Sequence, residues 1–290
     1  MDMKIIERLS REYDCDLTSL DHPSKNLHFS GRSKRLNKDI FVKLYDSKKR
    51  CSTELAILEV LQSSTLLGSY EYGECRAVIL EYCDMQDVTE MSMATAYDYG
   101  ILLGRFHKVA TNERTQQIRE LSGESSTLFA RIDETIGRIS SHPAYAKVLR
   151  IYHELSQFSA VYQQEYEALP KVVLHGDFGL RNIKLVENAP VLIDFERSKY
   201  DIAWMDLVKF FNREALDENL QARFLEGYQT QYPIAVPTPL LQKVLEFYTA
   251  IGIYSYTMHI PDQAFRLMGD RMIHQIDQFC ADLKVSAQTL

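Results

Sequence analysis

One stretch in the second half of the sequence decides the fold: Val-Val-Leu-His-Gly-Asp-Phe-Gly-Leu-Arg-Asn-Ile-Lys-Leu at residues 172–185. An apolar strand leads into His-Gly-Asp, a short loop follows, and Asn182 opens a second strand. After a turn, Val-Leu-Ile-Asp-Phe-Glu at residues 191–196 forms another apolar strand that ends in acidic residues. We expect a hairpin of this kind to present Asp177, Asn182 and Asp194 from one edge.

Polar side chains at such an edge meet the needs of phosphoryl transfer. One carboxylate must accept or orient the attacking hydroxyl, and an amide oxygen with a second carboxylate must hold Mg²⁺ on the phosphates. Asp177 and Asn182 have the spacing of the kinase catalytic loop His-Arg-Asp-x-x-x-x-Asn. The sequence therefore predicts Asp177 as the catalytic residue and Asn182 and Asp194 as metal ligands. Asp177-Phe-Gly spells the magnesium motif of protein kinases, but its position places it in the catalytic loop.

Three motifs in this order resemble those of the aminoglycoside phosphotransferase and choline kinase superfamily. That family's catalytic loop reads His-Gly-Asp-x-x-x-x-Asn, its metal strand reads Ile-Asp-Phe/Trp-Glu/Gly, and a later Asp-x-x-x-x-Asp-Leu stretch buttresses the loop. This chain has the first motif at residues 175–182, the second at 193–196 and the third at 201–207. The resemblance implies a small-molecule kinase that uses ATP and Mg²⁺.

The resemblance also implies roles for the residues around the catalytic aspartate. His175 would support the loop through hydrogen bonds, although its place beside the aspartate also suits a catalytic base. Asp201 and Asp206 would hold the loop backbone. Gly176 would let the loop bend where a side chain would clash. Arg181 would either contact phosphate or form a structural ion pair.

A lysine in the N-terminal half supports the same interpretation. Lys43 lies inside an apolar strand expected over residues 39–45, where an unpaired ammonium would be costly to bury. The resemblance implies that Lys43 reaches the α- and β-phosphates of ATP and pairs with a helix glutamate, Glu54 by preference or Glu59. The alternative is a lysine on the solvated face of an edge strand.

The rest of the nucleotide site rests on the order of segments along the chain. Residues 79–83 would be the hinge whose backbone binds adenine in this family, which makes Glu81 and Cys83 candidates for cofactor binding. No Gly-x-Gly-x-x-Gly loop precedes the lysine strand. Ser24 and Lys25, in the first turn, either contact the triphosphate or belong to a solvated turn.

The pattern of elements predicts an α+β fold. The chain is strand-rich with one inserted helix up to about Cys83 and mainly helical afterwards. With the resemblance, this predicts a bilobal protein-kinase-like fold, with a nucleotide-binding lobe over residues 1–83 and a catalytic and acceptor-binding lobe over 84–290. Helices are expected near the N-terminus, at 52–61 with a stripe of Leu55, Leu58 and Leu61, at 97–109, 126–139, 147–169, 205–211 and 218–228, and in two or three later segments. Strands are expected at 16–20, 27–30, 39–45, 68–72, 76–81 and within 171–194, with a polar turn at 31–38.

Composition limits the partners. The net charge of -7 argues against a protein that neutralises a phosphate backbone. It is compatible with a cationic substrate and equally with no cationic partner. The five cysteines lack a Cys-x-x-Cys pair, which predicts reduced thiols and no zinc site. Without a signal-peptide pattern or a long apolar run, the sequence predicts a soluble cytoplasmic protein with no membrane partner and leaves its oligomeric state open.

The acceptor is the least determined part of the prediction. The family's range and the acidic balance favour an aminoglycoside-type antibiotic, which would imply a resistance enzyme, or a small amino-alcohol or sugar-like metabolite. Aromatic residues at 246–259, followed by Asp262 and Asp270, would seat an amine, or they belong to the core. A protein Ser/Thr kinase and a non-catalytic nucleotide-binding member of the fold are the alternatives. The glycine before Asp177 and the absence of an Ala-Pro-Glu segment oppose the first, and the complete polar set opposes the second.

Overall fold

The computed structural model describes residues 3–21, 26–122 and 127–288, without the side chains of Met3 and of 284–288. Ser24 and Lys25, predicted in the first turn, lie outside the described residues. The N-terminal elements are α1 (Met3–Tyr13), β1 (Thr18–Leu20), β2 (Leu27–Ser33), β3 (Lys38–Tyr45), α2 (Lys48–Val60), β4 (Leu66–Tyr72) and β5 (Cys75–Glu81). The strands form a five-stranded antiparallel sheet in the order β1-β2-β3-β5-β4.

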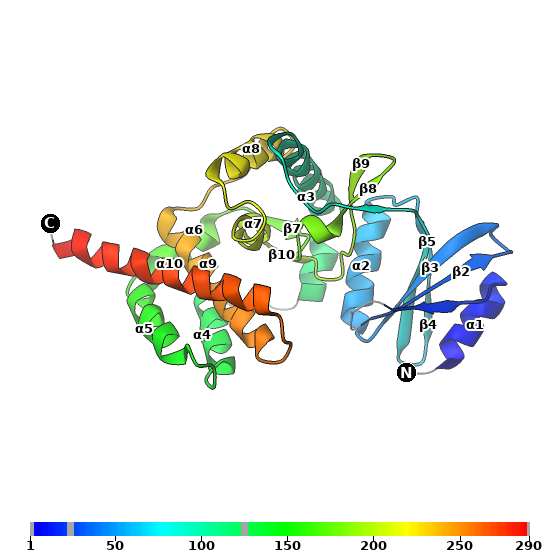
Figure 1. Cartoon of the computed structure of the whole chain (residues 1–290), viewed down its shortest axis with the longest axis horizontal. Helices are drawn as coiled ribbons and strands as arrows, with labels where there is room; N and C mark the ends of the chain where they lie inside the picture. Colours follow the sequence, from blue (N-terminus) through cyan, green and yellow to red (C-terminus); the bar gives the residue numbers. More distant parts are fainter. Residues whose placement is uncertain (1–2, 22–25, 123–126, 289–290) are drawn as a thin grey trace.

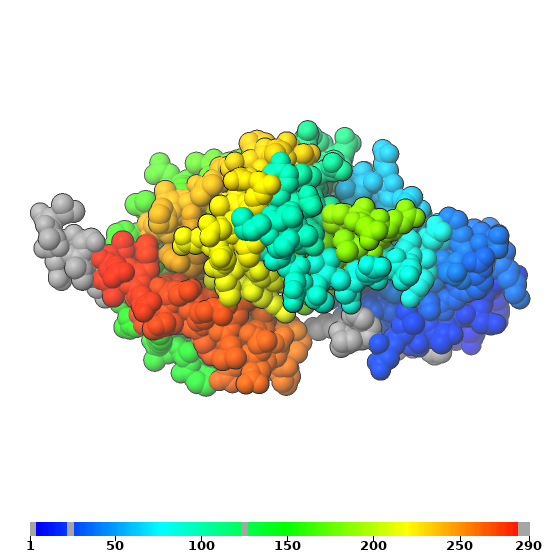
Figure 2. All heavy atoms as spheres, turned by 45° about the horizontal axis from the view of Figure 1, so that its top comes forward, coloured from blue at the N-terminus to red at the C-terminus, as the bar shows by residue number. Residues whose placement is uncertain are grey.

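The remainder of the described chain is mainly helical (Figure 1). Its helices are α3 (Met93–Ser122), α4 (Leu128–Arg138), α5 (Tyr145–Ser156), α6 (Ser159–Ala168), the short 3₁₀ turn η1 (Leu180–Asn182), α7 (Trp204–Phe211), α8 (Glu218–Gln229), α9 (Pro239–Thr257) and α10 (Gln263–Gln288). Its strands are β6 (Gln86–Asp87), β7 (Lys171–Leu174), β8 (Ile183–Val186), β9 (Ala189–Leu192) and β10 (Lys199–Ile202). The α+β arrangement is the one predicted, and Figure 2 shows the N-terminal part at one end of the molecule. The division at residues 83 and 84 stays a prediction.

The N-terminal sheet is covered on both faces. In β3, Ile40, Val42 and Leu44 alternate toward a small core that they share with α1. The residues between them point to the opposite face, which packs on α2, and there Tyr45 joins the large core of the helical part. Because side chains alternate along a strand, Lys43 falls on the same face as Tyr45 and therefore toward α2.

The helix α2 lies between the sheet and the helical part (Figure 1). The predicted stripe was wrong, because Leu55 and Leu61 are only partly buried. The buried residues of α2 spread around the helix instead: Cys51, Thr53, Glu54, Ala56, Ile57 and Leu58. A helix that packs on two sides buries more than one stripe, so a one-sided pattern could not describe it.

Four further expectations needed correction. The helix expected at 147–169 is two helices, α5 and α6, and near their junction the Ser156 hydroxyl donates to the carbonyl of His153 at 2.8 Å. Such local bonds compete with helix continuation, and the apolar spacing runs on across the break. The helix expected at 97–109 extends to Ser122. The strand β2 runs through Ser33, which shortens the expected turn, and β10 was not predicted. No helix of the described residues is long and apolar enough to cross a membrane.

Candidate active site

The strand β7 and the loop after it position the catalytic aspartate. β7 is buried apart from its first residue, and it pairs with β10 so that Leu174 lies opposite Lys199. Gly176 follows with φ +80°, a backbone conformation that side chains rarely adopt, and a Cβ there would lie 1.9 Å from the carbonyl oxygen of Arg197. Only glycine fits this turn, so the His-Gly-Asp order is required by the backbone path.

Asp206, on the helix α7, binds the backbone of this loop through hydrogen bonds. Its carboxylate accepts the backbone N–H groups of His175 at 2.7 Å and Gly176 at 2.8 Å. The same carboxylate lies 3.0 Å from Nε2 of His107, whose Nδ1 contacts the Tyr228 hydroxyl at 2.6 Å. Burial raises the pKa of Asp206, but the hydrogen bond and charge of His107 and the loop contacts outweigh it and hold the pKa below its ordinary value. The side chain predicted to support the loop therefore does so directly.

His175 links the catalytic loop to the strand that carries Asp194. Its Nε2 donates to the carbonyl of Ile193 at 3.0 Å, and its Nδ1 accepts the N–H of Asp177 at 3.3 Å. Burial lowers the pKa of His175, which keeps the imidazole neutral, as this pair of contacts requires. Both ring nitrogens are engaged with backbone, so the geometry supports the loop-bracing role and leaves the Asp177 carboxylate to handle the proton.

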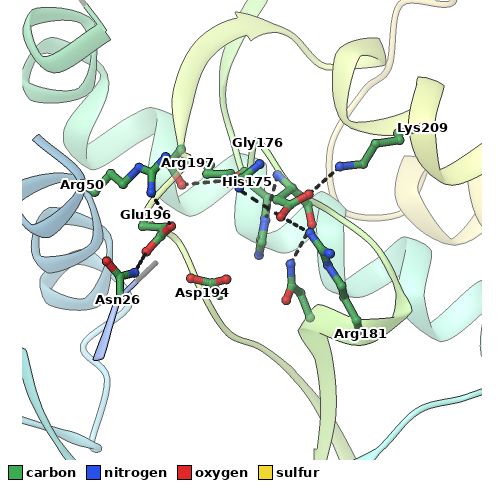
Figure 3. A network of polar contacts seen from close by, with 12 residues as sticks. Asn26, Arg50, His175, Gly176, Arg181, Asp194, Glu196, Arg197 and Lys209 are labelled. Atoms are coloured by element: carbon green, nitrogen blue, oxygen red, sulfur yellow. Dashed lines mark hydrogen bonds and ion pairs between the residues drawn. The ribbon is translucent and has the colours of Figure 1, made fainter. Parts of the chain in front are cut away.

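The carboxylate of Asp177 is buried among cations. Figure 3 labels these cations, which are Arg181, Arg197 and Lys209. Lys209 contacts Oδ1, Arg181 contacts Oδ2, and Nε of Arg197 lies 3.9 Å from Oδ2. Burial raises the pKa of Asp177, but Lys209, Arg181 and Arg197 together outweigh it and hold the pKa below its ordinary value. The group is therefore an anion at neutral pH and can accept a hydrogen bond from a hydroxyl.

The hairpin β8–β9 brings the two predicted metal ligands together. Ile183 pairs with Leu192, and the N–H of Ile193 donates to the backbone carbonyl of Asn182 at 3.1 Å. The Nδ2 of Asn182 donates to the carbonyl of Asp177 at 2.8 Å, so its Oδ1 is the atom left to act as a ligand. Asp194 follows directly with φ +67°, a left-handed conformation that is costly for a non-glycine residue. Amide and carboxylate oxygens on adjacent strand ends suit Mg²⁺.

Lys43 lies at the centre of a carboxylate cluster. Its Nζ is 2.7 Å from Glu54, 2.6 Å from Asp194 and 3.1 Å from Glu196. Burial lowers the pKa of Lys43, but the three carboxylates outweigh it and raise the pKa above the ordinary value, so the ammonium stays charged. Of the two glutamates considered from the sequence, Glu54 is the partner, and Glu59 lies 3.4 Å from Arg114 instead.

The same cluster offers a second set of oxygens to a cation. One oxygen each from Glu54, Asp194 and Glu196 lie within 4.8 Å of one another. Glu196 also accepts from Asn26 and lies 3.6 Å from Arg50. It was not predicted as a site residue, and its side chain reaches the cluster through the turn that follows the left-handed Asp194.

Sequence reasoning also missed two cations at the catalytic carboxylate. Lys209 lies three residues after Asp206 on α7, and this spacing puts both on one face of the helix, so the loop-supporting aspartate could have pointed to it. Arg197 had no comparable signal, because its place depends on the turn between Glu196 and β10. Arg181, for which an ion pair was one expectation, forms that pair with Asp177 itself.

Asp201 differs from its expected role. Its carboxylate contacts Arg131 on α4 at 2.8 Å and the hydroxyl of Tyr166 on α6, and it accepts its neighbour's N–H, from Ile202, at 2.8 Å. It therefore fastens β10 to the helices α4 and α6 and does not touch the catalytic loop. The spacing of the motif could not show that Asp201 and Asp206 have different roles, because the difference depends on the direction of each side chain. Only Asp206, on α7, points toward the loop.

The hinge candidates are largely engaged with the sheet. The side chain of Glu81 pairs with Lys38 at 2.6 Å, and its N–H donates to the carbonyl of Thr65 at 2.7 Å. The N–H of Tyr82 donates to the carbonyl of Asp39 at 2.8 Å. Cys83 follows these bonds, and its thiol donates to the Glu81 carbonyl at 3.7 Å. Adenine binding at this segment stays a prediction, with the backbone of Cys83 as its main candidate.

Two cavities flank the catalytic loop. A small one is lined by Asp177, Phe178, Gly179, Arg181, Lys209, Phe210, Arg213 and Glu214. A larger one, of about 360 Å³, is lined by Arg50, Arg197, Tyr256, His259 and Ile260. It joins the first turn of α2, the turn after β9 and the C-terminal end of α9. The aromatic segment expected to seat an acceptor divides accordingly, since Phe247 and Tyr254 are core residues and Tyr256 faces the cavity.

The sequence matches the phosphotransferase enzyme family over residues 29–240. No curated protein sequence matches the chain. An amicoumacin kinase in complex with AMP-PNP, Ca²⁺ and Ami superposes with a TM-score of 0.67 at 13% identity, covering 96% of this chain and 93% of that one. A choline kinase from Streptococcus pneumoniae gives a TM-score of 0.67 at 18% identity, covering 96% and 98%. A thermostable aminoglycoside phosphotransferase with AMP-PNP and hygromycin B gives 0.68 at 12% identity, covering 94% and 97%. At these identities the likeness shows the fold.

Proposed function

This chain belongs to the phosphotransferase enzyme family, and we propose that it transfers the γ-phosphate of ATP, with Mg²⁺, to a hydroxyl of a small acceptor. One observation carries the proposal. A buried, ionised Asp177 lies on a loop that His175 bonds to the strand of Asp194, and Asp194 in turn meets the buried Lys43. Catalytic carboxylate, metal ligand and phosphate-binding lysine thus form one connected unit, as phosphoryl transfer requires.

The residues that would hold the nucleotide are those of the Lys43 cluster and the hairpin. Bound ATP with its metal supplies the phosphoryl group and neutralises charge that develops on its oxygens. Asn182 Oδ1 and the Asp194 carboxylate would hold the metal, since both offer oxygen at adjacent strand ends. Lys43 would contact the α- and β-phosphates, and Glu54 would keep its ammonium in place.

The main role of Asp177 would be to orient the acceptor hydroxyl, and not to remove its proton before the phosphoryl group is transferred. A carboxylate whose pKa is held low is a weak base in the ground state, and it would take the proton only as the hydroxyl oxygen bonds to phosphorus and its proton becomes more acidic. The nearby ammonium of Lys209 and guanidinium of Arg181 can meanwhile stabilise negative charge on the transferred group. The cations around Asp177 would therefore lower the basicity of its carboxylate and, at the same time, stabilise negative charge on the phosphoryl oxygens.

The finer identity of the acceptor is proposed from the sequence and from the relatives. An amine-bearing or sugar-like small molecule, of the aminoglycoside or amino-alcohol type, matches the range of structures similar to this chain, which include a choline kinase, an ethanolamine kinase and an aminoglycoside phosphotransferase. Nothing in the described residues favours a protein acceptor. The intact Lys43, Asp177, Asn182 and Asp194 set opposes a non-catalytic role.

The test is ADP formation by the purified chain with ATP and Mg²⁺ across a panel of small alcohols. Asp177→Asn should retain ATP binding and lose turnover by about 10³-fold. Asp98→Asn, which changes an exposed aspartate on α3, is the matched control and should behave as the unaltered chain. Unimpaired turnover in Asp177→Asn, or failure of the unaltered chain to bind ATP with Mg²⁺, would overturn the proposal.

A further inference from the structure

The larger cavity beside the catalytic loop has a basic lining. Of the five described residues that line it, two are arginines and one is a histidine, and none of these five is acidic. Tyr256 and Ile260 complete the wall with apolar surface. Its volume of about 360 Å³ falls within the range of small-molecule sites, which is ~300–1,000 Å³. A small acceptor would therefore be held in a cavity that is locally positive, although the whole chain is acidic.

The two guanidinium groups are only loosely neutralised. Arg50 Nη1 lies 3.6 Å from Glu196 and 4.0 Å from Asp46, and Arg197 Nε lies 3.9 Å from Asp177. These separations are within ion-pair range but longer than a hydrogen bond. Figure 3 shows Arg50 and Arg197 next to each other, and both line the same cavity. Their donors are thus placed to form ordinary hydrogen bonds with a ligand.

Arg197 links the cavity to the proposed reacting centre. Arg197 belongs to both places, because it lines the cavity and its Nε faces the Asp177 carboxylate. Its backbone carbonyl packs against Gly176 of the catalytic loop, so this wall of the cavity is in direct contact with the loop. A molecule with one end bound by Arg50 and Arg197 would therefore have its other end within reach of the Asp177 carboxylate.

We propose that the acceptor carries a negatively charged group, a carboxylate or a phosphate ester, which Arg50 and Arg197 bind while a hydroxyl of the same molecule faces Asp177. The inference rests on the proposed kinase activity and names its substrate class. A planar guanidinium binds carboxylate and phosphate oxygens in pairs, so two adjacent ones make a directional anion site. Tyr256 and Ile260 would pack on the carbon skeleton.

The acids expected to bind an amine are engaged elsewhere. Asp270 accepts the hydroxyl of Tyr254 at 2.7 Å, and Asp262 accepts the N–H of Phe265 at 2.9 Å at the start of α10. Neither lines the cavity. A purely cationic acceptor would meet two like charges and no carboxylate of the lining, so the local field opposes the amine that the net charge of -7 suggested.

The test compares acceptors that differ only in charge. Glycerol is set against D-glycerate and glycerol 3-phosphate, ethanolamine against L-serine, and D-glucosamine against D-glucose, D-glucuronate and D-glucose 6-phosphate. We expect at least one acidic member to exceed its neutral or cationic parent by about tenfold or more in kcat/KM. Each rate is measured as ADP formation beside Asp177→Asn, so only transfer that depends on the aspartate is counted.

Two charge-matched variants locate the preference. Arg50→Ala should lower the acidic-over-neutral ratio by about tenfold, through a higher KM for the acidic member. Lys48→Ala removes the same charge from the same turn of α2 but from an exposed side chain outside the cavity, and should leave the ratio within about twofold. Equal loss in both variants would overturn the inference, because it would then reflect long-range charge only.

The remaining outcomes are also decisive. Turnover of neutral or cationic members at equal or higher efficiency overturns the anionic acceptor while leaving the kinase intact. If no panel member turns over, labelling of arginines by phenylglyoxal is followed by mass spectrometry at saturating ATP and Mg²⁺. Inorganic phosphate should then slow labelling of Arg50 and Arg197 by about threefold or more relative to sulfate, with no effect at the exposed Arg138. Absence of that protection overturns the inference.

Discussion

The loop that carries Asp177 and the cavity of about 360 Å³ beside it are held in different ways. The loop is buried, and its backbone is bonded to Asp206 and to the ring of His175. The cavity is walled by part-exposed side chains from three distant segments, with few hydrogen bonds among them. The proposed catalytic carboxylate is thus positioned by hydrogen-bonded backbone. The proposed choice of acceptor would depend on side chains that can be substituted without disturbing the fold.

The largest effect should follow from removing the support of the loop. Asp206→Ala leaves two buried backbone N–H groups and the ring of His107 without their acceptor, which we expect to cost about 3–5 kcal/mol of unfolding free energy. Turnover should fall with it, because Asp177, which directly follows these two N–H groups in the loop, loses its placement. Denaturant unfolding and ADP release measure both, and Asp98→Ala is the exposed control. A variant with normal stability would contradict the claim that hydrogen bonds to Asp206 hold the loop in place.

A smaller loss should follow from a single methyl group in the same loop. Gly176→Ala forces a Cβ against the carbonyl of Arg197 and strains a backbone at φ +80°. We expect about 2–3 kcal/mol of destabilisation and a lower kcat with little change in ATP affinity. The control is Gly137→Ala on α4, where a Cβ would meet no atom within 4 Å and should stabilise slightly. Equal stabilities of the two variants would show that the loop can relax.

The cavity should respond differently. Tyr256→Ala removes a part-exposed side chain whose ring packs edge-on against Phe265, so the unfolding free energy should fall by only about 1 kcal/mol. KM for the acceptor should rise severalfold while kcat changes little, since the ring would act on binding alone. Phe158→Ala, an exposed aromatic far from the site in sequence, controls for loss of surface area. A large fall in kcat would mean that this wall belongs to the catalytic machinery.

The same contrast explains how much could be predicted from the sequence. Asp177, Asn182, Asp194 and their hairpin are local, because a few residues with fixed strand and turn preferences bring them together. The pairing of Lys43 with Glu54 needed only the order of one strand and one helix. The α+β class likewise followed from strand-rich and helix-rich halves.

What sequence reasoning missed depends on contacts between distant segments. Lys209 and Arg197 reach Asp177 only after α7 and the turn before β10 have packed beside the loop. The net charge of -7 could not predict the charge of one cavity, which is set by the side chains that meet there. Asp201 was expected to hold the loop but contacts α4 and α6 instead. This miss has the same cause, because a motif gives the spacing of residues but not the direction of their side chains.

The smallest predicted effect concerns the acid side of the pH profile. The pKa of Asp177 is held below its ordinary value in the folded chain, so its ion pairs contribute stability above the unfolded pKa that is lost as pH falls through the folded one. Lys209→Met removes one of the cations around Asp177 and should move the acid limb of kcat/KM upward by less than about one pH unit. Lys184→Met, which frees the exposed Asp87 instead, should leave the limb in place. An unchanged limb in Lys209→Met would mean that Arg181 and Arg197 alone set the charge of the catalytic carboxylate.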